Sequence, residues 1–275
     1  MSLRIHTNLA SIAAQHQIKK TSESLEVTLR QMASGKRIHP QNANPADKAI
    51  ALQLEGQAKG WQASQQNIGN IIAFTDIAEG GLNEQSNLLI RLKELAIQAA
   101  NSEWDENSRS LLNLEFQQIL KEIDRIAQTT AMGKRSLLNN PKSEFEVQVG
   151  PGSDEYHRIV VDLTANTSVK SLDLSGEGIE TASDARGALK AVEQAQWEIA
   201  KARAQFGSFA ARLRSALSHA EEMEENLYRA YSNVADADMA QTTSDFYRLR
   251  ALQQYQMASL AEANQQPMSV IKLIV

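Results

Sequence analysis

The sequence predicts a mainly α-helical protein: a long antiparallel helical bundle or coiled coil built from both chain ends, with a small β-hairpin region at the tip. Three observations support this fold class. The chain has 38 alanines and 24 glutamines, which favour helix. No proline interrupts residues 152–266. Apolar residues recur at alternating steps of three and four over roughly 50 residues of the second half. Since aromatic residues make up only 5% of the chain, burial must come from thin, extended contacts.

The two chain ends carry apolar residues at helical spacing, and we predict that they form one inner domain of residues 1–40 and 238–275. A linker at residues 41–56 should follow the first helix, because Pro40 and Pro45 disfavour helix around them. Four of the last five residues are apolar, which a soluble monomer seldom leaves exposed, so we expect copies of the chain to bury them. The residues expected to make these polymerisation contacts are Ile5, Leu9, Ile12, Leu25, Leu29, Phe246, Leu249, Leu260, Leu273 and Val275.

The middle of the chain predicts a three-helix outer rod made of residues 57–140 and 184–237. One helix should end near residue 100, a polar turn at 101–107 follows, and a second helix resumes with an apolar stripe at 112–126. The heptad pattern at 185–237 predicts a third, much longer helix, whose many alanines allow close packing. Thr75 and Gln85 are polar positions in the first seam and can fix its register. The larger seam residues are Ile71, Leu82, Leu89, Leu92, Ile199, Phe206, Phe209, Leu213 and Met223.

In residues 141–183 the spacing of apolar residues changes from helical to alternating, which predicts a β-hairpin. Phe145, Val147 and Val149 alternate with polar residues, glycine and proline supply turn chemistry at 150–154, and a second β-prone run follows at 158–163. Acidic and small polar residues are frequent around these strands, as in solvated surface segments. We therefore place residues 141–183 as an excursion at the tip of the rod.

Catalytic, cofactor and metal sites receive no support from the sequence. The five histidines form no helical metal motif, and no nucleotide-binding or hydrolase signature occurs. A net charge of −5 provides no basic surplus for nucleic acid. No window approaches the roughly 18 apolar residues of a membrane span, so we expect no membrane insertion, and the first residues lack the apolar stretch of a secretory signal.

The heptads and apolar ends are compatible with two kinds of protein. One is a subunit of a helical polymer, and the other is a discrete coiled-coil adaptor that binds one partner helix. An adaptor needs one amphipathic groove. Apolar helices at both ends and a long rod between them instead provide surfaces at two radii, as a heterologous assembly of identical copies requires. The sequence therefore favours the polymer.

Several motifs near both ends resemble those of bacterial flagellin. They are the residues at 3–11, 22–25, 33–38, 44–47, 78–84 and 92–101, and at 235–240 and 260–267 near the other end. The resemblance covers about residues 1–140 and 185–275 and implies a minimal flagellin without large central variable domains. It implies an extracellular filament for swimming motility, exported without a cleavable signal by the flagellar export apparatus with a secretion chaperone, and contacts with filament cap and junction proteins. A hook-filament junction protein, which shares flagellin-like helical ends, is the alternative within the same resemblance.

The resemblance also implies recognition by the flagellin-sensing Toll-like receptor of animals. The receptor recognises an arginine, a leucine and a glutamate on the first two outer helices of the family, and the matching positions here are Arg91, Leu95 and Glu115. Four residues of separation predict that Arg91 and Leu95 share one helix face. As the alternative, Arg91 and Glu115 serve contacts between subunits.

Overall fold

The computed structural model describes residues 8–38, 44–133, 135–139, 144–162 and 165–274 of the chain. These residues divide into two compact units, which belong to Met1–Gln57 with Glu225–Val275 and to Ala58–Glu224. Each unit therefore combines segments from both halves of the sequence. Long helices dominate both units, and the only strands among the described residues belong to two short hairpins of the second unit.

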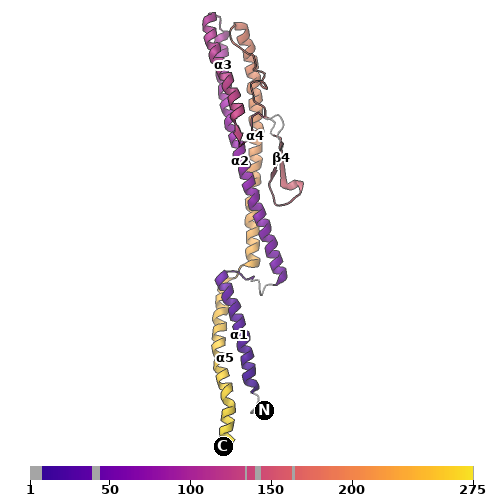
Figure 1. Cartoon of the computed structure of the whole chain (residues 1–275), viewed down its shortest axis with the longest axis vertical. Helices are drawn as coiled ribbons and strands as arrows, with labels where there is room; N and C mark the ends of the chain where they lie inside the picture. Colours follow the sequence, from indigo (N-terminus) through magenta and orange to yellow (C-terminus); the bar gives the residue numbers. More distant parts are fainter. Residues whose placement is uncertain (1–7, 39–43, 134, 140–143, 163–164, 275) are drawn as a thin grey trace. The chain divides into compact units, whose positions relative to one another are not determined.

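The first unit is built around two helices that come from opposite ends of the chain. Helix α1 (Leu9–Ser34) and helix α5 (Met239–Ile274) lie side by side (Figure 1). Asn8 begins α1, because its Oδ1 accepts a hydrogen bond from the Ser11 amide at 3.0 Å. Gly35 ends the helix in the left-handed conformation, with φ at 66°. The predicted pairing of helices from the two chain ends is confirmed.

Helix α2 (Pro45–Ala100) begins earlier than the sequence indicated, since residues 45–56 were expected to belong to a linker. Proline is tolerated in the first turn of a helix, because the N–H that it lacks would have no helical partner there. The Asn44 carbonyl accepts the Lys48 amide at 3.1 Å, and its side chain accepts the Ala46 amide at 3.2 Å. The expectation of a helix break at Pro45 was therefore wrong, and Pro40 lies outside the described residues.

The second unit contains three helical segments that run along one another. Helix α3 (Glu106–Thr129) follows a turn after α2, and helix α4 (Ala182–Ala235) forms the long helix expected at 185–237. Ion pairs between Asp76 and Arg214 at 3.6 Å and between Lys93 and Glu193 at 2.9 Å show that α2 and α4 are antiparallel. The mainly α-helical fold class predicted from composition and heptads is confirmed.

The core of the second unit follows the heptad seams. Apart from Ile71 and Met223, which are half-buried, the larger seam residues named above are all buried. Gln85 is also completely buried, and its amide group donates hydrogen bonds to the carbonyls of Ile123 in α3 at 3.1 Å and Thr167 at 3.3 Å. A polar seam position therefore links α2 to α3 and to the segment that precedes α4, which favours one register over others.

Two antiparallel hairpins follow α3. The first pairs β1 (Ala131–Met132) with β2 (Arg135–Ser136), and the second pairs β3 (Glu144–Gln148) with β4 (Arg158–Asp162) in a register that sets Val147 opposite Ile159. A single turn of 3-10 helix, η1 (Glu155–His157), precedes β4. The predicted small β-hairpin is confirmed, with strand boundaries close to those expected from the alternating pattern.

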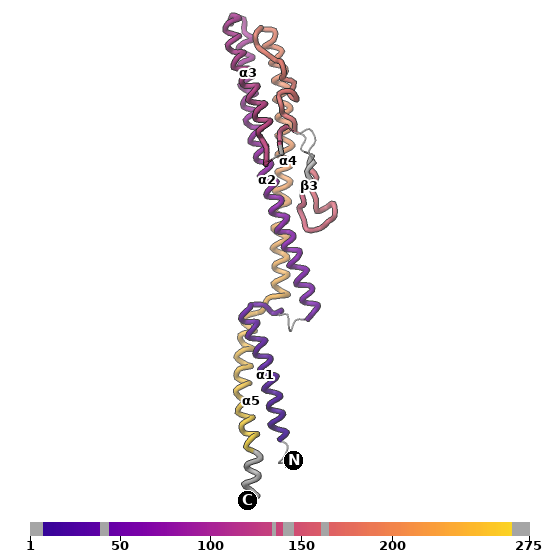
Figure 2. The backbone as a smooth tube through the Cα atoms, in the orientation of Figure 1, coloured from indigo at the N-terminus to yellow at the C-terminus, as the bar shows by residue number. Residues whose placement is uncertain are grey.

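The position of the larger hairpin differs from the expected tip. Its turn packs on α2 at Gly60, where an added Cβ would lie 2.6 Å from the Cβ of Pro151, and the rings of Trp61 and His157 are 6.0 Å apart. These residues of α2 are far from the turn that follows Ala100, and Figure 2 shows the hairpin beside the helices. The tip assignment was wrong because a glycine and an aromatic ring on α2 provide a docking site that periodicity alone does not indicate.

Candidate assembly surface

The contact between α1 and α5 combines small polar side chains, which are fully buried, with apolar side chains that are half-buried. The buried residues of α1 are Ser11, Thr21 and Thr28. The Ser11 hydroxyl donates to the Asn264 side chain at 2.7 Å, and Gln253 of α5 donates to the Ser22 hydroxyl at 3.0 Å. These hydrogen bonds define how the two helices pair. The apolar residues at the same spacing on α1, which are Ile18, Leu25 and Met32, are only half-buried, so the pairing provides only part of the hydrophobic stabilisation that long helices need in water.

Many large apolar side chains of the same two helices are exposed to solvent. Leu9 is 62% exposed and Tyr255 is 80% exposed. Among the described side chains, the large exposed apolar and aromatic residues of α1 and α5, which we call the terminal apolar face although they lie on more than one side of each helix, are Leu9, Ile12, Leu29, Met239, Tyr247, Leu252, Tyr255 and Met257. Exposed apolar surface of this extent is characteristic of a protein interaction site rather than of an isolated soluble chain.

Some of the residues predicted for polymerisation belong to this face, and others are half-buried. Leu9, Ile12 and Leu29 belong to the terminal apolar face. Leu25, Phe246, Leu249 and Leu260 are half-buried. Ile5, Val275 and the side chain of Leu273 lie outside the part of the chain that the structure describes.

The sequence analysis missed Tyr247 and Tyr255, the two most exposed aromatic residues of α5. Both lie off the apolar stripe that was followed through Phe246, Leu249 and Leu260. The signal that could have found them is that α5 carries large apolar or aromatic residues around most of its circumference. A helix of this kind requires partners on more than one side.

Arg91 and Glu115 form an exposed ion pair between α2 and α3. The Arg91 Nε and Nη2 atoms donate to Glu115 Oε1 at 2.9 and 2.7 Å, and Nη1 donates to Glu94 Oε2 at 3.1 Å. The hydrogen bond to Glu115 is the largest of the effects that raise the pKa of Arg91. The structure therefore brings together two of the three residues expected to contact the receptor.

Leu95 does not share this surface, because its side chain is completely buried. At this height α2 packs against both α3 and α4, so its buried stripe is wide enough to include Leu92, Leu95 and Ala96. The expectation that Arg91 and Leu95 present one common face was wrong. Arg91 lies at the edge of the stripe, whereas Leu95 lies inside it.

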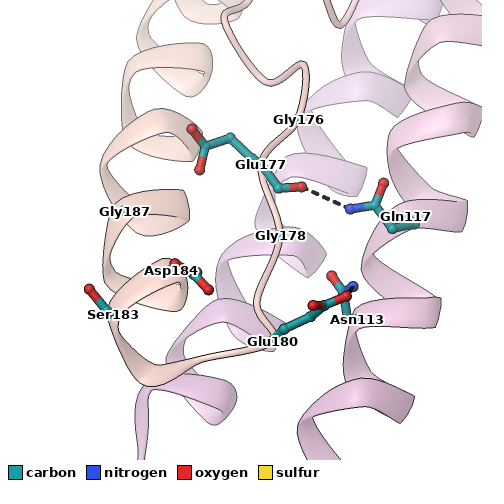
Figure 3. A pocket seen from close by; sticks show the side chains of 9 residues that line it. All are labelled: Asn113, Gln117, Gly176, Glu177, Gly178, Glu180, Ser183, Asp184 and Gly187. Carbon is teal, nitrogen blue, oxygen red and sulfur yellow. Dashed lines mark hydrogen bonds between the residues drawn. The ribbon is translucent and has the colours of Figure 1, made fainter.

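A pocket of about 440 Å³ lies between α3 and the segment that leads into α4 (Figure 3). Its polar groups bind one another: Gln117 donates to the Glu177 carbonyl at 2.8 Å, and Asn113 donates to the Glu180 carboxylate at 3.0 Å. Asp184 and Thr181 share a hydrogen bond at the start of α4. These contacts close the loop onto α3. No group of three potential metal ligands occurs among the described residues.

None of the helices in the described part of the chain contains an apolar stretch that could span a membrane. The candidate assembly surface is the terminal apolar face on the paired helices α1 and α5.

Comparisons with known proteins cover nearly the whole chain. Residues 5–143 match the family profile of the bacterial flagellin N-terminal helical region, and residues 189–274 match that of the bacterial flagellin C-terminal helical region. A flagellin from Halalkalibacterium halodurans is 31% identical over 271 residues, which are 98% of this chain and 99% of that protein. The flagellar filament 33 kDa core protein of Treponema phagedenis is 27% identical, with 98% and 99% of the two chains covered. The crystal structure of Bacillus cereus flagellin, at 27% identity, covers 56% of this chain and 88% of its own with a TM-score of 0.51.

Proposed function

This chain belongs to the bacterial flagellin family and is a structural, non-enzymatic subunit that polymerises into the extracellular flagellar filament for motility, and from this premise we propose that polymerisation occurs through the terminal apolar face. The observation that supports the proposal is the exposure of eight large apolar or aromatic side chains on two paired helices. No finding favours a hook-filament junction protein or a discrete coiled-coil adaptor.

The free energy available from this face is large enough to drive assembly. Burying a large apolar side chain contributes roughly 1.5 to 3 kcal/mol, so several such residues together contribute on the order of 10 kcal/mol. Association of two proteins costs roughly 4 to 15 kcal/mol in lost freedom of motion. Contacts with several neighbours in a polymer contribute further favourable free energy, whereas a single partner would leave part of the face exposed.

We propose different roles for the parts of the chain that the sequence analysis distinguished. Residues 1–40 and 238–275 act as the inner domain that assembles, and residues 57–140 and 184–237 act as a stiff outer rod. The rod suits this role because its alanine-rich seam is buried within one chain, with Ala188 and Ala195 completely inaccessible. The rod therefore needs no neighbour to keep its helices together.

The remaining partners are proposed from the family and from the chemistry of the surface. An exposed apolar face would aggregate before export, so a secretion chaperone should cover it until the export apparatus takes the chain. Filament cap and junction proteins should contact the ends of the polymer. The Toll-like receptor, if it binds this chain, should contact the exposed pair of Arg91 and Glu115, and the alternative for this pair is a contact between subunits.

Seeded polymerisation of matched tyrosine variants tests the assembly surface. Tyr255→Ser removes a ring from the terminal apolar face, and Tyr156→Ser removes another highly exposed ring from the hairpin turn of the second unit. A buried ring that contributes about 2 kcal/mol corresponds to a roughly thirty-fold change in the critical concentration. We expect this increase for Tyr255→Ser and little change for Tyr156→Ser. Equal critical concentrations for the two variants would contradict the proposed surface.

A further inference from the structure

Three short segments, two from near the start of the chain and one from near its end, meet in the first unit. They are residues 35–38 after α1, residues 44–47 at the start of α2, and residues 234–238 between α4 and α5, and we call this meeting point the joint. Lys36 and Asp236 form an antiparallel bridge, in which the Arg37 amide donates to the Ala235 carbonyl at 2.8 Å and the Ala237 amide donates to the Gly35 carbonyl at 2.9 Å. The two connections that lead to α1 and to α5 are thus hydrogen-bonded to each other.

Arg37 belongs to the first segment of the joint and contacts the other two. Besides its amide bond to Ala235, its Nη2 donates to the Val234 carbonyl at 2.6 Å. Its Nη1 lies 3.6 Å from Asp47 Oδ2 in the first turn of α2. The carbonyls of Val234 and Ala235 are among the last four of α4, which have no acceptor role inside their own helix. Arg37 therefore satisfies the end of one helix while it pairs with the start of another.

The electrostatics of the joint favour an arginine at this position. A cation stabilises the carboxyl end of a helix, and Asp47 stabilises the amino end of α2, so the guanidinium lies between two negative features. A guanidinium has five donors in a planar fork and can serve both acceptors together, whereas the compact ammonium of a lysine serves one of them well. Position 37 is thus sensitive to the difference between arginine and lysine.

Neighbouring residues hold the segment that carries Arg37. Gly35 adopts a φ of 66°, which other residues rarely adopt, and so turns the chain out of α1. The Lys36 ammonium donates to the Tyr231 hydroxyl at 3.2 Å and lies 5.7 Å from the centre of that ring. The hydrogen bond to Tyr231 is the largest of the effects that raise the pKa of Lys36. These contacts hold residues 35–37 against the last turns of α4.

We propose that Arg37 is a positioning residue for filament assembly. It fixes the joint from which α1 and α5 leave the longer helices, so that the two terminal helices present their apolar face as one pair. The contact between α1 and α5 fully buries only Ser11, Thr21 and Thr28 on α1 and leaves the apolar residues of that helix half-buried or exposed, so the joint adds a constraint that hydrophobic burial between the two helices does not supply. The inference rests on the assembly surface proposed above.

The test uses the full chain with Arg37→Gln, Arg37→Lys and a control, Arg229→Gln. Arg229 is an exposed arginine of α4 that pairs with Glu225 one helical turn away. Seeded polymerisation gives the critical concentration, hydrogen exchange reports the amides of Arg37 and Ala237, and thermal unfolding reports the second unit. We expect Arg37→Gln to raise the critical concentration at least ten-fold and to speed exchange at both amides. Arg37→Lys should fall between this variant and the unaltered chain, and the control should match the unaltered chain.

The possible outcomes separate this inference from the assembly surface itself. Unchanged critical concentration in Arg37→Gln would overturn the role of Arg37 and leave the terminal apolar face in place. If Arg37→Gln raised the critical concentration and also lowered the melting temperature of the second unit, the role of Arg37 would likewise be overturned, since the two changes together would indicate a general effect on folding. If Tyr255→Ser and Tyr156→Ser assembled equally well, the assembly surface would be refuted, and the role of Arg37 would fall with it.

Discussion

Two adjacent glycines of α2 should respond in opposite ways to the same substitution. A Cβ added at Gly80 meets nothing within 4 Å, so Gly80→Ala should gain the helix propensity of alanine, about 0.5 to 1 kcal/mol. A Cβ added at Gly81 would lie 2.7 Å from Thr130 Oγ1 and 2.9 Å from Leu138 Cδ1. Leu138 is completely buried, and overpacking of this kind costs about 1 to 3 kcal/mol. Gly81→Ala should therefore be less stable than Gly80→Ala by about 1 to 3 kcal/mol.

Thermal unfolding followed by circular dichroism checks this difference. For a unit of this size, 1 kcal/mol shifts the melting temperature by about 2 to 4 °C, so the two variants should melt roughly 2 to 12 °C apart. Gly207→Ala is a matched control in α4, because its Cβ also meets nothing within 4 Å, and it should behave like Gly80→Ala. A Gly81→Ala protein that melts at or above the temperature of Gly80→Ala would refute the packing described for the contact between α2, α3 and the small hairpin.

Three further predictions concern the rod, the terminal helices and one helix cap. Ala202→Leu and Ala216→Leu add bulk to the seam of α4 at about 1 to 3 kcal/mol per site, and electron microscopy should show altered or fewer filaments. In dilute subunits, amide hydrogen exchange should be faster in α1 and α5 than in α3, and polymerisation should slow the exchange of α1 and α5. Equal protection of the three helices before assembly would contradict this expectation. The hydrogen bond from Ser108 lowers the pKa of Asp105 in the folded chain. This cap therefore stabilises α3 at pH values above the ordinary pKa of about 3.9, and its contribution is lost as the pH falls through the lower pKa of the folded chain. Acid titration of Asp105→Asn should lack this transition.

The seams of the rod could be predicted from sequence because their cause is local and periodic. A residue such as Leu82 or Leu89 is apolar for the same reason at every turn: one side of its helix faces other helices of the same chain. The hairpin strands were predictable for a related reason, since the alternation of Phe145, Val147 and Val149 matches the period of a strand with one buried face. A pattern that repeats over many positions predicts an element even where single residues depart from the pattern.

Features that depend on one contact between distant residues were not predictable in this way. The docking of the hairpin depends on Gly60 and Trp61, and neither residue differs from an ordinary helix residue when only α2 is considered. The burial of Leu95 depends on how many neighbours α2 has at that height, which helical spacing does not report. The start of α2 at Pro45 required the capping role of Asn44 to be weighed against the general tendency of proline to break helices.

The two units differ in where their apolar residues find partners, and this difference explains why one chain can be both stable and assembly-competent. In the second unit, Phe116 and Phe206 are fully buried by other helices of the same chain, so this part has a hydrophobic core of its own. In the first unit, the buried positions of α1 include Ser11 and Thr28, and the larger side chains of α1 and α5 are half-buried or exposed. Replacing these small polar residues with leucine would strengthen the pair in a single chain, but it would also separate the two helices and change the face that they present together. A contact whose fully buried positions on α1 are small polar residues therefore suits a subunit whose terminal helices must remain available for other copies.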